Sequence, residues 1–266
     1  MNDLSTRKPI FDAARRIVGH GLSQAEVNAL DAAIDRAEAQ PRPDAGPLLP
    51  ATACPAPHRL GTLSERYESG GCGPGTVSGG VGDPGGVSYG LFQLASRTGT
   101  AARFLAAEGK RWAARFGSSL PGSAEFSATW QDIAAHEGET FAEAQRLFVA
   151  RSHYRPAVLA VQVATGLDLD ARADAVRDAV WSTAVQHGSA ARLLCAAVAE
   201  ADQSGPRTDA AYDRALIEAI YRQRSDYVSA LAQRSGPAVR RTLMNVAQRR
   251  YPDELAVALA MLPTLA

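Results

Sequence analysis

Residues 64–71, SERYESGG, and residues 86–94, GVSYGLFQL, enclose the most unusual stretch of this 266-residue chain. Ten of its 23 glycines lie between Gly70 and Gly90. Glycine loses more backbone freedom on folding than other residues, so this stretch is costly to order and is expected to serve a specific purpose. Within it, the β-prone residues 76–78 and 87–89 predict a short hairpin, and Asp83-Pro84 and Gly85-Gly86 indicate turns.

The rest of the chain has a helical pattern. Apolar residues recur at helical spacing and predict helices at 97–115, 123–135, 139–151, 154–165, 170–185, 188–202, 209–233 and 236–250. Residues 1–40 predict a separate helical hairpin module, and residues 41–58, with six prolines, predict a linker. Residues 59–266 then form the main domain. The expected fold class is mainly α with a small glycine-rich β-hairpin insertion.

The charge balance argues against several classes of protein. Lys and Arg number 28, and Asp and Glu also number 28, so the net charge is zero and nucleic-acid binding is not expected. No apolar run reaches the length of a membrane span, and the N-terminus lacks a signal-peptide pattern. We therefore expect a chain that is made in the cytoplasm without a signal peptide and has no membrane span.

The sequence offers little for metal or cofactor chemistry. Its five histidines show no metal-ligand spacing, so we expect no metal and no cofactor. Residues 80–85, GVGDPG, match a dinucleotide-binding pattern, but no strand and helix flank them as that motif requires. Cys54 and Cys72 are expected to be free thiols, with a disulfide between them as the alternative. Cys195 is expected in the core.

Glu68 is the first candidate for chemistry. It falls at the C-terminal end of a predicted helical segment, where the negative end of the helix dipole disfavours a charged carboxylate. A carboxyl group that stays protonated near neutral pH is what glycosidic bond cleavage requires. The alternative, on position alone, is a solvated glutamate at a frayed helix end.

Two motifs carry a family resemblance. Glu68-Ser69, followed by the segment Gly90-Leu91-Phe92-Gln93, resembles the lysozyme superfamily, in particular goose-type lysozymes and lytic transglycosylases. The longer segment from Glu65 to Ser96 looks like phage-type endolysins and related effector or tail-associated muramidases. The resemblance implies a lysozyme-like two-lobed fold and a muramidase that cleaves the β-1,4 glycan strands of peptidoglycan. It also implies action on the cell wall or periplasm, with Glu68 as the general acid. We expect the chain to be a monomer.

The second catalytic group is open. Asp83 is the best candidate, but an aspartate is also favoured in a Gly-Asp-Pro-Gly turn on backbone grounds alone. Thr76, Ser78 and Ser88 are the alternative, as hydrogen-bonding groups that hold the attacking water. The expected substrate-binding residues in this region are Ser69, Thr76, Ser88, Tyr89 and Gln93.

A second group of candidates lies at the end of the helix predicted over 170–185. Gln186 and His187 are interpreted as substrate contacts, with helix capping by His187 as the alternative. Trp181, one turn earlier, is expected in the core. The pairs Arg240-Arg241 and Arg249-Arg250 are interpreted as solvated helix faces that can also attract an anionic wall.

Two other functions compete with the muramidase. One is a chitosanase-like or chitinase-like hydrolase of another β-1,4 amino-sugar polymer. The other is a non-catalytic module of a phage tail or an effector, which binds the cell wall and does not cleave it.

Overall fold

The computed structural model describes residues 58–68, 73–79 and 85–263. The predicted N-terminal module, all but the last residue of the predicted linker, Cys54 and Cys72 lie outside these residues. The described elements, in chain order, are α3 (Thr62–Glu68), β1 (Ser88–Tyr89), β2 (Leu94–Ala95), α4 (Thr100–Ala106), η1 (Lys110–Phe116), α5 (Ala124–Val149), η2 (Ala150–Tyr154), α6 (Arg155–Thr165), α7 (Asp174–Gln186), α8 (Ala190–Ala201), α9 (Tyr212–Gln233), α10 (Pro237–Asn245), η3 (Val246–Arg250) and α11 (Tyr251–Ala260). The prediction of a mainly α fold is confirmed.

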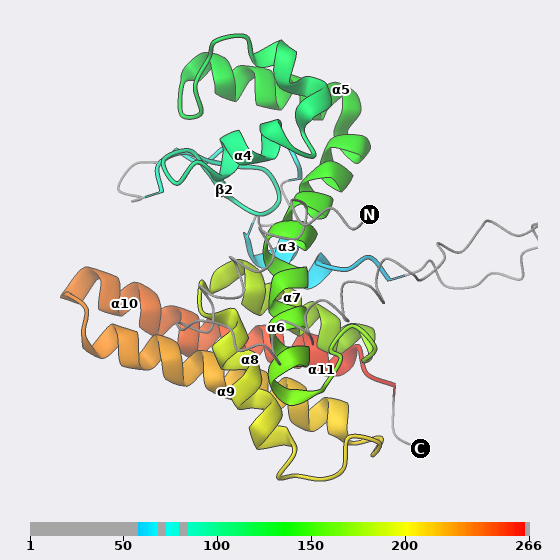
Figure 1. The fold of residues 1–266 in the computed structure, drawn as a ribbon. Helices are drawn as coiled ribbons and strands as arrows, with labels where there is room; N and C mark the ends of the chain where they lie inside the picture. The colour runs from blue at the N-terminus through cyan, green and yellow to red at the C-terminus, as the bar shows by residue number, and fades with distance from the viewer. Residues whose placement is uncertain (1–57, 69–72, 80–84, 264–266) are drawn as a thin grey trace, which may run out of the picture.

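The helices form two groups that α5 connects. Figure 1 shows α4, β2 and the first part of α5 at the top, and α7 to α11 at the bottom, with α5 running from one group to the other. Ser123 begins α5, because its side chain accepts a hydrogen bond from the amide of Phe126. The helix then continues through Gly138 with a kink at Glu137, where φ is −130°. The sequence predicted two helices, at 123–135 and 139–151, and the backbone does depart from helical geometry between them, at Glu137.

The kink persists because Glu137 has three side-chain partners. Its carboxylate accepts hydrogen bonds from Arg111, Arg115 and the indole nitrogen of Trp112, all on η1. These contacts hold η1 against the bend in α5. The predicted helix at 97–115 is split into α4 and η1, and Gly109 lies in the connection with its amide bonded to the Phe104 carbonyl.

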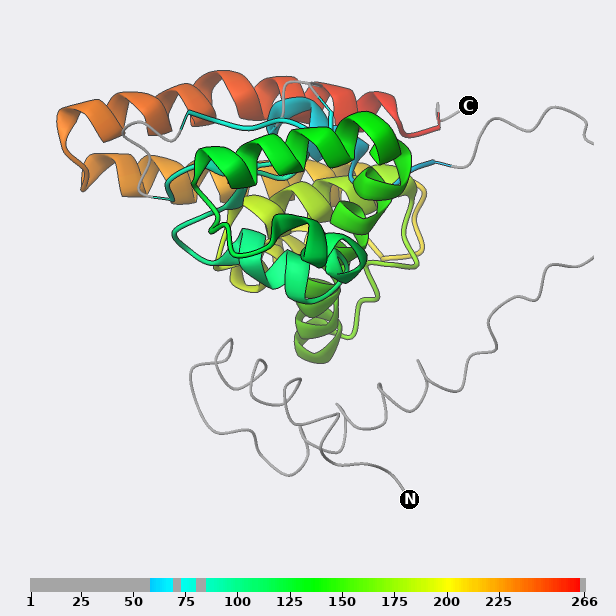
Figure 2. The ribbon, with the colours of Figure 1, turned by 90° about the horizontal axis from the view of Figure 1, so that it is seen from above.

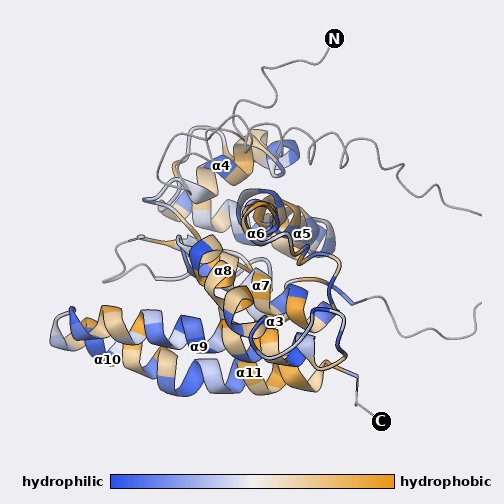
Figure 3. Ribbon diagram, turned by 60° about the horizontal axis from the view of Figure 1, so that its bottom comes forward, coloured by the Kyte–Doolittle hydropathy of each residue, from blue (hydrophilic) through white to orange (hydrophobic). Residues whose placement is uncertain are grey.

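The C-terminal helices form a long rod. Figure 2 shows α10, η3 and α11 running continuously alongside α9. η3 is a π-helical turn, and Pro237 and Pro252 stand at the starts of α10 and α11, where a proline removes no intrahelical hydrogen bond. The sequence prediction ended this helix at 250 and missed α11. Figure 3 shows alternating hydrophilic and hydrophobic segments along α9, α10 and α11, as expected for amphipathic helices.

The predicted hairpin is present and has one more strand segment. Val77 forms an antiparallel bridge with Tyr89, and the amide of Ser78 donates to the carbonyl of Ser88. β1 also pairs with β2, with Tyr89 opposite Leu94 in the antiparallel register. This second pairing was not predicted, because residues 94–95 are too few to give a strand pattern.

Candidate functional site

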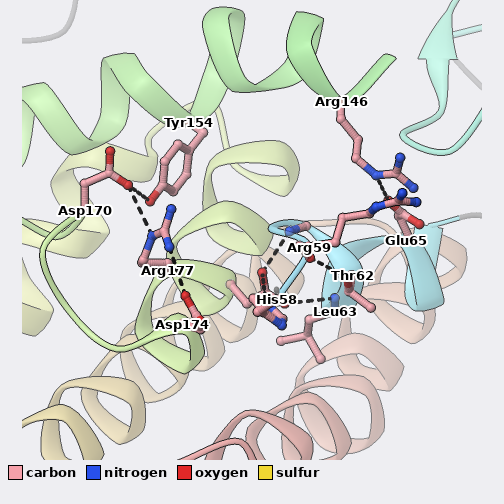
Figure 4. A network of polar contacts seen from close by, with 12 residues as sticks. His58, Arg59, Thr62, Leu63, Glu65, Arg146, Tyr154, Asp170, Asp174 and Arg177 are labelled. Atoms are coloured by element: carbon pink, nitrogen blue, oxygen red, sulfur yellow. Dashed lines mark hydrogen bonds and ion pairs between the residues drawn. The ribbon is translucent and has the colours of Figure 1, made fainter. Parts of the chain in front are cut away.

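Helix α3 ends at Glu68, and contacts with α7 fix its N-terminal end. The carboxylate of Asp178, on α7, accepts hydrogen bonds from the amides of Gly61 at 2.8 Å and Leu63 at 3.1 Å. His58 Nε2 lies 3.3 Å from the same carboxylate (Figure 4). Asp178 is fully buried and caps α3 from more than a hundred residues away. No local sequence pattern signals this cap.

Two arginines hold the sides of α3. Arg146, on α5, forms a short ion pair with Glu65, as Figure 4 shows. The guanidinium of Arg250 lies 5.5 Å from the ring centre of Tyr67, at a distance typical of a cation–π contact. A seven-residue helix has little stability of its own, so these contacts fix it. They place the backbone of Glu68 at a defined position; its side chain lies outside the description, as do Ser69 and Asp83.

Trp181 joins α3 to the Gly90–Gln93 segment. A Cβ atom on Gly61 would lie 2.9 Å from the indole of Trp181, and Gly61 has φ of 93°, so only glycine fits there. On another side, the ring of Phe92 lies 5.7 Å from that of Trp181. Trp181 is 1% exposed, which confirms the prediction that it is a core residue. Trp181 therefore contacts both the residue that precedes α3 and the Gly90–Gln93 segment.

Gln145 is a positioning residue that the sequence reasoning missed. From α5, its side chain accepts a hydrogen bond from the Leu91 amide at 2.9 Å and donates one to the Pro74 carbonyl at 3.1 Å. Gly90 has φ of 74°, and a Cβ atom there would lie 2.1 Å from the Gln145 side chain. A buried amide that bonds two loops is not recognisable from one glutamine in a helical pattern.

The predicted binding residues of the hairpin have internal partners. The Thr76 hydroxyl donates to the Gly73 carbonyl at 2.7 Å, and the Ser88 amide donates to Ser78 Oγ at 2.8 Å. Tyr89 is fully buried, and its hydroxyl accepts from the Gly122 amide at 2.8 Å. These contacts show that Thr76, Ser88 and Tyr89 stabilise the hairpin. Their binding of a ligand stays a prediction.

Gln93 is the predicted binding residue with the most distinctive backbone. It is the non-glycine residue with positive φ, 52°, within the described ranges. Such a conformation costs free energy for a residue with a side chain and tends to persist where function requires it. Its side chain is part-buried, and Nε2 makes one long contact of 3.5 Å with the Gly90 carbonyl.

Gln186 and His187 belong to a buried polar network between α7, α9 and the C-terminal rod. Gln186 Oε1 accepts hydrogen bonds from Arg224 at 2.7 Å and from the Tyr251 hydroxyl at 2.9 Å. His187 is 8% exposed, and its Nε2 lies 3.0 Å from the same hydroxyl. Both residues are thus part of the packing, and their predicted contact with a ligand is untested.

Arg224 and Glu254 form the centre of this network. Both are 0% exposed, and they pair at 3.0 Å. Burial would raise the pKa of Glu254, but the charges of Arg224 and Arg250 outweigh it and hold that pKa below its usual value. Burial, with those two arginines, lowers the pKa of His187 to about 4. A buried arginine has no signature in a local sequence pattern.

The structure adds no metal centre or membrane span within residues 58–68, 73–79 and 85–263. That part of the chain brings no three His, Cys, Asp or Glu side chains together in a way that could hold a metal ion. Its helices are also not long and apolar enough to cross a bilayer. Cys195 is a free, half-buried cysteine beside the core.

Comparison with known proteins identifies the family. The model of the family described as type VI secretion system spike protein VgrG3-like, C-terminal, matches residues 60–250. The chain belongs to this VgrG3-like C-terminal family. The type VI secretion system spike protein VgrG3 of Vibrio cholerae serotype O1 is 38% identical over 135 residues. The match covers 51% of this chain and 13% of that relative, so the chain corresponds to a small part of the spike protein's length.

The family membership corrects two predictions. The assignment to phage-type endolysins in the lysozyme superfamily is wrong, because the match is to a secretion-system spike family. The assignment as a glycoside hydrolase, with muramidase, chitosanase or transglycosylase activity, is also overturned, since the VgrG3-like description does not point to a glycosidase. The motif Glu-Ser with Gly-Leu-Phe-Gln covers few residues, and a match that short supports an activity only weakly. The catalytic roles given to Glu68 and Asp83 depended on that activity.

Proposed function

We propose that this chain is an effector module of a type VI secretion spike, which binds the peptidoglycan glycan strands of a target cell without cleaving them. The VgrG3-like C-terminal match over residues 60–250 is the observation that carries the proposal. The matched relative is itself described as a spike protein. Delivery by such a spike would bring the module to the cell wall or periplasm of the target cell.

The arrangement of the helices supports a polymer as the ligand. We propose that the group containing α4 and β2 and the group containing α7 to α11 act as the two lobes of a lysozyme-like arrangement (Figure 1). Glycan strands are long and polar, and binding sites on both lobes would contact several sugar units of one strand. Glu68, at the end of α3, and Gln93, beside the hairpin, are the residues proposed to bind the sugars.

The anchoring of α3 supports Glu68 in this role. Binding groups work best on rigid elements that a second layer of contacts supports. Helix α3 has seven residues, yet Asp178, Arg146 and Arg250 hold it from three other elements. A carboxylate on a helix that is fixed in this way can accept hydrogen bonds from sugar hydroxyl and acetamido groups, and charge-assisted bonds of this kind are stronger than neutral ones.

Co-sedimentation with purified, insoluble peptidoglycan tests the proposal. The wild-type chain is expected to pellet with the wall material, and Glu68→Ala is expected to weaken binding about tenfold through loss of a charge-assisted hydrogen bond. Glu125→Ala, which removes an exposed glutamate at the start of α5, is the matched control and should bind like wild type. The supernatant is analysed for soluble glycan fragments in the same experiment.

Two outcomes would overturn the proposal. If the wild-type chain stays in the supernatant, it does not bind the wall. If soluble glycan fragments accumulate with time, the module cleaves the strands and its role is not binding alone. Pelleting that Glu68→Ala and Glu125→Ala share equally with wild type would remove Glu68 from the binding surface.

A further inference from the structure

Four arginines on the C-terminal rod have different environments. The guanidinium of Arg240 donates to the carbonyls of Ala232, Gln233 and Ser235. It therefore satisfies carbonyl groups at and just beyond the end of α9. Arg250 donates to Glu254 at 2.6 Å and stacks on Tyr67. These two arginines are thus used in packing, although the sequence placed all four together on solvated faces.

Arg249 lines an open depression on the rod. The depression has a volume of about 360 Å³. Its lining residues are Thr242, Asn245, Val246, Arg249 and Arg250. Arg249, Thr242 and Asn245 are exposed. Within the part of the chain that the structure describes, none of the residues that line the depression is acidic.

A π-helical turn forms one side of this depression. The turn spans Val246–Arg250, and both of its arginines line the depression together with Thr242, which lies more than one turn earlier. π-turns inside helices are rare and are frequent at functional sites, because the extra residue changes the direction of the side chains that follow. The turn is an observation independent of the charge.

The depression lies next to the end of α3. Arg250 belongs to its lining and also stacks on Tyr67, the residue immediately before Glu68. A ligand group held by the depression would therefore adjoin the position where Glu68 is proposed to bind sugar. The chain has no net charge, so attraction of an anionic ligand has to come from a local group of this kind.

We propose that this depression binds a carboxylate of the wall polymer, an inference that rests on the proposed function. The Arg249 guanidinium pairs with the carboxylate through two parallel hydrogen bonds, a geometry that arginine and carboxylates share. The Thr242 hydroxyl and the Asn245 amide supply further hydrogen bonds, and Val246 contacts a small alkyl group beside the carboxylate. The lactyl group of muramic acid and the peptide stem both carry carboxylates of this kind.

Calorimetric titration with three soluble probes tests the inference. The probes are N-acetylmuramic acid, with its lactyl carboxylate, N-acetylmuramyl-L-alanyl-D-isoglutamine, with a carboxylate on the peptide, and a neutral N-acetylglucosamine trimer. Arg249→Gln is expected to weaken binding of at least one carboxylate probe about tenfold and to leave the neutral trimer unchanged. The carboxylate probe that loses affinity identifies the source of the bound group.

Arg241→Gln is the matched control. Arg241 is an exposed arginine on the same rod, outside the lining of the depression, so the variant makes the same charge change and should titrate like wild type. Equal affinities of Arg249→Gln and wild type for both carboxylate probes would overturn the inference. A loss shared by Arg241→Gln and Arg249→Gln would also overturn it, because it would show a general charge effect.

The same measurements distinguish failure of the carboxylate site from failure of the proposed wall binding. If wild type pellets with peptidoglycan and Arg249→Gln titrates like wild type, the carboxylate site is wrong and wall binding stands. If wild type neither pellets nor binds any of the three probes, wall binding itself is wrong.

Discussion

The two helix groups are built around different interiors. In the α4, η1 and α5 group, aromatic rings pack on one another: Trp130 lies 4.7 Å from Phe141 and 5.4 Å from Phe104, measured between ring centres. In the α7, α9 and α11 group, the central contact is a fully buried ion pair between Arg224 and Glu254. The first interior depends mainly on shape and apolar area, with the indole nitrogens of Trp112 and Trp130 bonded to Glu137 and Pro74. The second interior depends on its polar partners.

This contrast indicates which substitutions the fold tolerates. Apolar interiors accept substitutions of similar volume at modest cost. A buried charge without its partner is far more costly, because the desolvation of that charge is no longer offset. In the polar interior, the Arg224 guanidinium also contacts the rings of Tyr221 and Tyr251, 4.7 and 4.4 Å from their centres. A substitution that keeps the side-chain shape should therefore lower the free energy of unfolding more in the polar interior than in the aromatic one.

Glu254→Gln should have the largest effect. The substitution keeps the side-chain shape but removes the negative charge that faces Arg224 and Arg250. Leaving the buried guanidinium without its partner should lower the free energy of unfolding by about 3 kcal/mol or more. Urea unfolding at pH 7.5 measures the change.

A double variant provides the control. Arg224→Met combined with Glu254→Gln removes both charges and replaces the guanidinium with an apolar side chain of similar length. It should be more stable than Glu254→Gln alone, since no unpaired charge remains. A double variant that is less stable than the single one would show that the network stabilises the fold mainly through its other hydrogen bonds.

Much of the fold could be predicted from sequence, for reasons that differ along the chain. Helical spacing of apolar residues correctly indicated α6, α8 and α9 within a few residues. The predicted break between the helices at 123–135 and 139–151 is present as a kink at Glu137. The sequence did not indicate the three side-chain donors from η1 that hold Glu137 at this kink. Long-range contacts of this kind decide helix boundaries, and a local pattern does not contain them.

The candidate site was less predictable than the fold. The sequence correctly indicated that residues 76–78 pair with residues 87–89, because β-prone residues separated by turns are a local signal. It did not indicate Asp178 as the cap of α3 or Gln145 as the clamp of the hairpin, since both act over large sequence distances. The predicted glycosidase activity was wrong because it rested on two short sequence motifs.

Acid should destabilise the polar interior through His187. The pKa of this side chain is about 4 in the folded chain and near 6.5, its ordinary value, when unfolded. Between these values the unfolded state binds more protons, so stability is full above pH 6.5 and falls as the pH drops toward 4. At pH 5 the loss from this group is roughly 2 kcal/mol.

His187→Gln isolates this effect. Glutamine keeps a polar partner for the Tyr251 hydroxyl but does not titrate, so its unfolding free energy should change less between pH 7 and pH 5 than that of wild type. Denaturant unfolding at several pH values measures both curves. Parallel curves for the two proteins would mean that His187 is not held neutral by the fold.

The smallest effect is expected in the aromatic interior. Phe141 is fully buried between Trp130, Trp112 and Phe104, and Phe141→Leu keeps the site apolar while removing part of its volume. We expect a loss of about 1 to 1.5 kcal/mol in the free energy of unfolding, because neighbouring rings can shift to fill most of the space. Phe141→Asn, which places an amide without a partner at the same position, should cost about 2 kcal/mol more. If Phe141→Leu instead destabilised the chain as much as Glu254→Gln, the aromatic interior would depend on exact ring contacts, and both interiors would be equally intolerant of change.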